Sequence, residues 1–384
     1  MPPAGTGANA GGGFGTDGAL TISTTSTQTA WSWLDGGADA GDDEITLGSG
    51  LSLAVGDEIL ILSVQGDDAG THEYAFVAAS GGSTGELIIE PPLRYDYDGD
   101  SVVLVQRVPH YTTLNITSGG SLRADTWSGL GGGTVVARAT GVVTVAGNIN
   151  ASERGFFGGI GVVGNTYDPT QGESYEGPGG NSASPNLGGG GAYPRTSSRT
   201  DLCDSGGGGA HAAAGSNGTT RTGGTSSTGG LSYGSAALTE WFYGSGGGGG
   251  SPDRENGDGR FASNISGDGG RGGGLILLYS ASGIVVSGTI VSNGANGVSG
   301  VTGGGEVGGG GGGAGGTILL AAPSITIGGT VRAQGGTGGA GADFGYIGNS
   351  SRGGAGAVGR IRLEANTVTG TTTPSAGSTA AWTN

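Results

Sequence analysis

The segment TILLAAPSITIGGTV, residues 317–331, contains the two features that decide the fold: short apolar strands and a glycine between them. Ile325, Ile327 and Val331 alternate with small or polar residues, which is typical of short strands that bury one side. Gly329 stands where the chain has to change direction, and without a Cβ it can turn a tight corner. The segment therefore predicts one coil of an all-β structure.

The same pattern of apolar and glycine positions recurs along the chain. It occurs as VTVAGNI at 143–149, IVVSGTI at 284–290 and ITIGGTV at 325–331, with a looser copy from residue 114 to 122. Another short strand is expected before each full copy, at 134–139, 275–280 and 317–322, and a last partial copy opens at 360–365. The starts at 275, 317 and 360 are 42 and 43 residues apart, a period typical of stacked repeats. The repeats predict a β-solenoid in which each coil buries its apolar row against the next.

Glycine supplies 96 of the 384 residues, while hydrophobic residues make up 34% and charged residues 12%. This composition excludes a conventional Leu-rich helical core, and only 12 prolines exclude collagen. Glycine tracts such as 246–250 and 308–313 lie between the coils. We expect them to pack side by side as extended threefold helices of the polyglycine II kind, because backbones without Cβ atoms can approach closely. The alternative is a flexible linker.

Charge divides the chain into an acidic head and a nearly neutral body. Residues 1–100 hold 16 acidic residues and one arginine, Arg94, and so carry −15 of the total −16. Five short apolar runs separated by Gly, Asp and Pro predict a small acidic β-barrel or sandwich at 17–106. From the change in charge near residue 100, we expect this domain to attach the protein to its carrier. We expect a Gly/Pro-rich arm at 1–16, and at 107–384 a solenoid body with a large insertion at 152–274. The acidic charge disfavours nucleic acid, and no stretch is apolar enough for membrane insertion.

Several enzyme chemistries are excluded by residue counts. The chain has no lysine, which removes P-loop and Schiff-base sites, and its single Cys203 allows no cysteine-based zinc cluster. Two G-x-S-x-G matches, at 81–85 and 230–234, are expected by chance at this glycine content and lack the strand-to-helix context of a nucleophile elbow. The sequence therefore predicts a protein that is not an enzyme, without catalytic residues.

No cofactor is expected, with one weak exception. Asp96, Asp98 and Asp100 alternate around Gly99, and several carboxylate oxygens close together suit Ca²⁺. The alternative is a solvated hairpin turn, for which Asp-Gly is a strong signal.

Aromatic and arginine side chains near the glycine tracts are the candidates for receptor binding. Aromatic rings can stack on sugars or fill a protein pocket, and arginine adds directional hydrogen bonds. The alternative is a small local core where aliphatic residues are scarce. The candidates are Tyr193, Arg195, Arg199, Trp241, Phe242 and Tyr243.

The tracts GGGGGS at 246–251 and GGGAGG at 311–316 resemble the polyglycine-sandwich adhesins at the tips of T-even-type phage long tail fibres. The opening GTDGALTI at 15–22 and the later coils are also similar to glycine-rich phage tail proteins and related bacterial surface proteins. The resemblance implies a structural adhesin in the virion tail that displays loops to a bacterial surface glycan or outer-membrane protein. It also implies attachment to other tail or filament subunits through the acidic domain, in an oligomer or larger assembly.

Two other functions remain open. One is a subunit of a self-assembling bacterial extracellular filament or surface layer, which would place the protein outside the cell or on its surface. The other is a polysaccharide depolymerase, because β-solenoids often host that chemistry.

Overall fold

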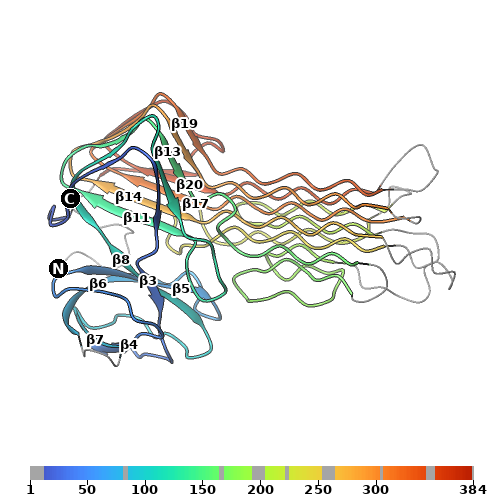
Figure 1. Ribbon diagram of the computed structural model, residues 1–384, viewed down its shortest axis with the longest axis horizontal. Helices are drawn as coiled ribbons and strands as arrows, with labels where there is room; N and C mark the ends of the chain where they lie inside the picture. Colours follow the sequence, from blue (N-terminus) through green and yellow to red (C-terminus); the bar gives the residue numbers. More distant parts are fainter. Residues whose placement is uncertain are drawn as a thin grey trace.

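The computed structural model describes residues 13–80, 85–163, 168–192, 204–220, 225–252, 264–302, 306–342 and 351–382, and every regular element within them is a β-strand. This confirms the all-β class for the described residues. In the same part of the chain no helix is long and apolar enough to cross a membrane. Figure 1 shows a body of strands and a long extension that leaves it, here called the stalk.

Coiled strands in the body form three parallel stacks. The first contains β11 (Thr134–Ala139), β14 (Leu275–Ser280), β17 (Thr317–Ala321), β20 (Arg360–Glu364) and β22 (Ser378–Ala380). The second contains β1 (Gly18–Ile22), β9 (His110–Ile116), β12 (Val143–Val145), β15 (Ile284–Val286), β18 (Ser324–Ile327) and β21 (Thr367–Thr369). The third contains β2 (Thr25–Gln28), β10 (Ser121–Ala124), β13 (Asn148–Asn150), β16 (Thr289–Val291) and β19 (Thr330–Arg332). Strand β9 pairs with both β11 and β12 and so joins the first two stacks into one sheet.

Equivalent residues of successive coils pair in register. Ile276 pairs with Ile318, and Ile318 pairs with Ile361. All three side chains are buried in one core inside the solenoid. The 42- and 43-residue steps between them are those of the sequence repeat, so the predicted stacking of parallel coils is confirmed.

The first stack is buried on its outer side as well. Leu277 and Leu319 point away from the solenoid interior and pack with Leu60 and Leu104 in a second core. Strands buried on both sides read as continuous apolar runs, which explains LILLYS at 275–280.

The outer side of the first stack is covered by a six-stranded antiparallel sheet in the order β3-β8-β5-β6-β7-β4. Residues 33–35 also hydrogen-bond to residues 46–48, so the sheet closes into a small barrel around its own core. The strands are β3 (Trp31–Trp33), β4 (Glu44–Thr46), β5 (Glu58–Gln65), β6 (His72–Ser80), β7 (Glu86–Glu90) and β8 (Val102–Val108).

Residues 18–28 differ from the sequence-based boundary, which assigned them to the acidic domain. Strand β1 pairs in parallel with β9, and β2 pairs in parallel with β10. These residues form the first coil of the solenoid, and the barrel at 31–108 is inserted between the first and second coils. The physical reason is that Leu20 and Ile22 pack with the solenoid core rather than with the barrel core.

The stalk leaves the solenoid at one corner. After β13, β16 and β19 the chain runs outward before it returns as β14, β17 and β20. The described residues of the stalk are therefore 151–163, 168–192, 204–220, 225–252, 264–274, 292–302, 306–316, 333–342 and 351–359. Figure 1 shows its described tracts running side by side, away from the body.

Candidate functional site

The central tract of the stalk, residues 308–316, is a fully buried run of eight glycines and Ala314. Its hydrogen bonds repeat every third residue, the period of an extended threefold helix. Residues 308, 311 and 314 donate their N–H groups to the tract 245–251, residues 310, 313 and 316 donate to 292–298, and residues 312 and 315 donate to 354–357. The carbonyl groups of the tract accept hydrogen bonds from three other tracts. Residues 308, 311 and 314 accept from 267–273, residues 310 and 313 accept from 336–339, and residues 309 and 312 accept from 206–209. The tract is thus held by six neighbours through its backbone.

Side chains are excluded from this packing. A Cβ added at Gly311 would lie 1.9 Å from the carbonyl oxygen of Gly207, and one at Gly313 would lie 2.0 Å from that of Arg271. Real Cβ atoms do not approach backbone oxygen so closely, so the glycines are required by the lateral hydrogen bonds. The result is an elongated support whose central tract carries no side chain larger than the methyl group of Ala314.

Trp241, Phe242 and Tyr243 lie at the base of the stalk and are buried, with exposed fractions of 1%, 7% and 1%. The Trp241 ring stacks on His72 of the barrel with 3.5 Å between centroids, and its backbone N–H donates to Gly70. The sequence predicted these three rings as candidates for receptor binding, but burial makes them unavailable to a receptor. They form the local core that was the alternative, because aliphatic side chains are scarce there.

Tyr243 shows how this aromatic group joins the stalk to the solenoid. Its hydroxyl donates to the carbonyl of Gly132 at 2.6 Å and lies 2.8 Å from the hydroxyl of Thr134 in β11. The ring packs edge-on against Trp127. Tyr193, Arg195 and Arg199, the other receptor-binding candidates, lie outside the described residues.

The acidic turn at 96–100 contains the three candidate calcium ligands. Asp96 accepts a hydrogen bond from the backbone N–H of Ala40 at 2.8 Å. Asp98 and Asp100 line an open hollow of about 490 Å³ together with Asp67. Among the described residues, no three His, Cys, Asp or Glu side chains are grouped so that they could hold a metal ion. The structure thus shows a hydrogen-bonded turn at this position.

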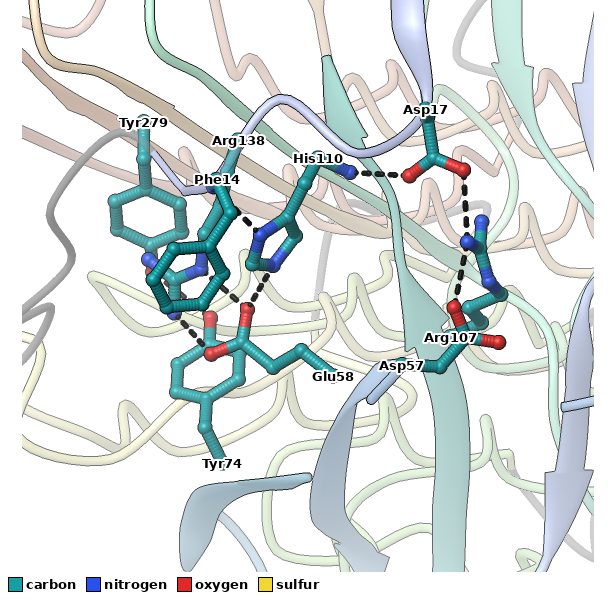
Figure 2. Close-up of polar contacts among 9 residues, drawn as sticks. All are labelled: Phe14, Asp17, Asp57, Glu58, Tyr74, Arg107, His110, Arg138 and Tyr279. Atoms are coloured by element: carbon teal, nitrogen blue, oxygen red, sulfur yellow. Dashed lines mark hydrogen bonds and ion pairs between the residues drawn. The ribbon is translucent and has the colours of Figure 1, made fainter. Parts of the chain in front are cut away.

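A buried charge network lies where the barrel meets the solenoid (Figure 2). Glu58 of β5 accepts from Arg138 Nε at 2.5 Å and Nη2 at 2.9 Å, and from His110 Nε2 at 2.7 Å. The backbone N–H of Phe14 donates to His110 Nδ1, so the ring carries its proton on Nε2. Burial alone would raise the pKa of Glu58, but Arg138 and His110 together hold it below its ordinary value. The ion pair between Glu58 and Arg138 joins β5 of the barrel to β11 of the solenoid.

Two tyrosines complete the surroundings of Arg138. Its guanidinium carbon lies 4.5 Å from the ring centre of Tyr74 and 4.7 Å from that of Tyr279. The two hydroxyls are 3.0 Å apart. Nearby, the Arg107 guanidinium bridges Asp17 and Asp57, with 2.7 Å to each carboxylate (Figure 2). These contacts fasten the barrel to the solenoid.

Glu173 connects barrel, solenoid and stalk. Its carboxylate accepts from Gln65 Nε2 at 2.9 Å, from the Trp127 indole at 2.9 Å and from the backbone N–H of Phe157 at 2.7 Å. Burial raises the pKa of Glu173 although these bonds oppose the effect.

Sequence reasoning missed these buried charges. The available signal was a charged residue inside an apolar strand: Arg138 interrupts TVVARA, and Glu58 opens EILILSVQ.

The sequence matches no protein family model and no curated protein. Among solved structures, the chain is similar to the gp54 tailspike of Acinetobacter baumannii bacteriophage AP22, determined in complex with A. baumannii capsular saccharide. The identity is 11%, the TM-score is 0.21, and the match covers 92% of this chain and 59% of that one. It is also similar to the tailspike gp49 from Pseudomonas phage LKA1, with 12% identity, a TM-score of 0.18, and coverage of 90% and 62%. The chain spans about three fifths of each tailspike. At such TM-scores the likeness supports no conclusion about this chain.

Proposed function

We propose that the protein is a receptor-binding protein of a phage tail that acts as an adhesin and not as an enzyme. The observation that carries the proposal is the central tract of the stalk, which bonds to six neighbouring tracts through its backbone. Such a lattice loses little conformational freedom when a ligand binds at its far end, because the support is already ordered. It suits a protein whose task is to hold contact groups away from its body.

The division of labour follows from the positions of the parts. The body contains the acidic barrel, which serves for attachment to other tail subunits in the virion. The end of the stalk away from the body serves for contact with a bacterial surface glycan or outer-membrane protein. Trp241, Phe242 and Tyr243 support the stalk at its base. Tyr193, Arg195 and Arg199 remain the candidates for the contact itself.

The proposal is tested by binding of the labelled protein to a panel of bacterial strains, measured by flow cytometry. We expect saturable binding to a subset of strains, and replacement of Tyr193, Arg195 and Arg199 by alanine to weaken it about tenfold or more at an unchanged melting temperature. The matched control replaces Phe14, an exposed aromatic residue on the body, by alanine, and should bind like the wild type.

Two results would count against the adhesin. One is an absence of saturable binding to every strain of a broad panel. The other is release of oligosaccharides from purified capsule or lipopolysaccharide by the wild type, which would favour the depolymerase.

A further inference from the structure

One face of the stalk carries exposed aliphatic side chains in regular rows. In the tract 156–163, Ile160 and Val163 are exposed by 66% and 53%, and they follow Phe157 at three-residue steps. A threefold extended chain brings every third side chain to the same side, with about 9 Å between them. These residues therefore form one row along the stalk.

The neighbouring tract, 264–272, presents a second row. Ile265, Asp268 and Arg271 follow one another at the same three-residue step, and Ile265 is exposed by 46%. Hydrogen bonds join the two tracts: the N–H of Gly269 donates to the carbonyl of Gly159, and that of Gly161 donates to the Asp268 carboxylate. The Arg271 guanidinium lies 4.1 Å from the ring centre of Phe157, which places both side chains on the same face.

A third row follows on the tract 292–301. Val298 and Val301 are exposed by 53% and 58%. The N–H of Val298 donates to the carbonyl of Asp268, and Val301 and Ile265 exchange two backbone bonds. Ile265 also bridges to Val163. The rows thus lie in register across three bonded tracts.

This face is hydrophobic and carries no net charge. Clustered exposed aliphatic side chains mark an interaction surface more often than scattered ones do. The three tracts contain one acid, Asp268, and one base, Arg271, so their net charge is zero in a chain of −16. Two copies would repel each other through the acidic domain, which carries most of that charge, but not through this face.

The two charges also determine which partner fits. In a twofold arrangement of two such faces, Arg271 of each copy can lie opposite Asp268 of the other, while the aliphatic rows meet between them. A strongly charged partner would meet no net opposite charge on this face.

We propose that this stalk face, formed by Ile160, Val163, Ile265, Val298 and Val301, is a self-association surface that binds the same face of a second copy of the chain. Ten residues at about 3.1 Å each and three backbones at about 5 Å spacing give roughly 450 Å² per copy. An interface of roughly 900 Å² in total belongs to the weak, reversible class. The inference stands independently of the receptor and of the adhesin function.

Sedimentation velocity of the full chain tests the proposal across about 1–100 µM, where interfaces of this size dissociate. We expect a reversible monomer–dimer equilibrium for the wild type. Replacing Val298 and Val301 by aspartate should weaken association about tenfold or more, because the new carboxylates would lose water without gaining a partner. The matched control is Val285→Asp, an exposed valine of β15 on the solenoid, which should leave the equilibrium unchanged.

A charge exchange identifies the orientation of the two copies. Arg271→Glu and Asp268→Arg should each weaken self-association, since like charges would meet. An equimolar mixture of the two variants should associate again, because each variant then faces the opposite charge on the other. This recovery also shows that both variants are folded.

The proposal is overturned if the wild type stays monomeric at the highest concentration. It is also overturned if the Val298 and Val301 variant dimerises like the wild type, or if Val285→Asp has the same effect.

Discussion

Ala314 shows which side chain the centre of the stalk accepts. It is the one residue other than glycine between 308 and 316, and it is fully buried. Its backbone still donates to Ser245 and accepts from Gly273, so a methyl group fits at this position without breaking the lateral bonds. At Gly311 the carbonyl oxygen of Gly207 already occupies the space that a methyl group would need.

We expect Gly311→Val to destabilise the protein by about 3 kcal/mol or more, at or beyond the upper end of ordinary overpacking, because backbone cannot move aside like a side chain. The measurement is urea unfolding followed by circular dichroism. The matched control is Gly50→Val, where an added Cβ meets nothing within 4 Å. Equal stability of the two variants would show that the tract is loosely packed.

His211 makes the stability of the stalk depend on pH. Its ring is fully buried, Nδ1 donates to the carbonyl of Gly315 at 2.9 Å, and burial lowers the pKa to about 3. The unfolded chain takes up this proton near pH 6.5. The contribution of His211 is therefore complete above about pH 6.5 and is lost as the pH falls toward 3.

We expect His211→Gln to be less stable than the wild type at pH 7 but to lose less stability on acidification. The difference in slope should be up to about 1.4 kcal/mol per pH unit between about pH 6 and pH 4. Urea unfolding at several pH values measures it. Parallel slopes for the two proteins would contradict the assignment.

At the scale of elements, the contact between β5 and β11 depends on a buried ion pair. Glu58→Gln leaves Arg138 without its counter-charge, and we expect a loss of about 3–5 kcal/mol at pH 7. The pKa of Glu58 is lowered, so the pair stabilises fully above about pH 4.5, the ordinary value, and less as the pH falls through the lowered value. The difference between variant and wild type should therefore shrink in acid.

Calorimetry at pH 7 and pH 3 measures this difference. The control is Glu44→Gln, an exposed carboxylate of β4 in the same barrel, with an expected effect within about 0.5 kcal/mol. A comparable loss in both variants would show that the buried pair contributes nothing specific.

The repeated strands were predictable because their residues alternate. Ile276 and Ile318 occur one period apart, and identical positions of a coiled chain must meet. The docking of the barrel was not predictable. Leu277 and Leu319 are apolar like the residues of the solenoid core, and nothing in the neighbouring sequence shows that they pack against the barrel instead.

The candidate site was predictable in part only. Trp241 lies just before the glycine tract 246–250, where no periodic pattern shows whether a ring points inward or outward. Its burial depends on Gly70 and His72, residues about 170 positions earlier. The charges at Glu58 and Arg138 were visible, but their pairing depends on how the barrel lies on the solenoid.

At the scale of the molecule, barrel and solenoid share one core. Leu60 and Leu104 of the barrel pack with Leu277 and Leu319 of the first stack. The acidic domain is therefore not a separate head on a linker, and its removal would expose the outer side of that stack.

We expect the barrel and the solenoid to unfold in one cooperative calorimetric transition, because neither can bury its apolar face alone. A chain lacking residues 31–108, with its ends joined by a short Gly/Ser linker, should aggregate on expression. Two separated transitions, or a soluble folded product after the deletion, would show that the parts are independent.

The three-residue repeat of the lateral hydrogen bonds restricts how the stalk can change length. One added residue in a tract would turn every later N–H toward the wrong neighbour, whereas three added residues restore the direction. Because each excursion of the chain along the stalk has an outgoing and a returning tract, the smallest neutral insertion is six residues, three in each tract. The surrounding tracts have to lengthen by the same amount. The lengths of natural variants of the stalk should therefore differ by multiples of about 9 Å.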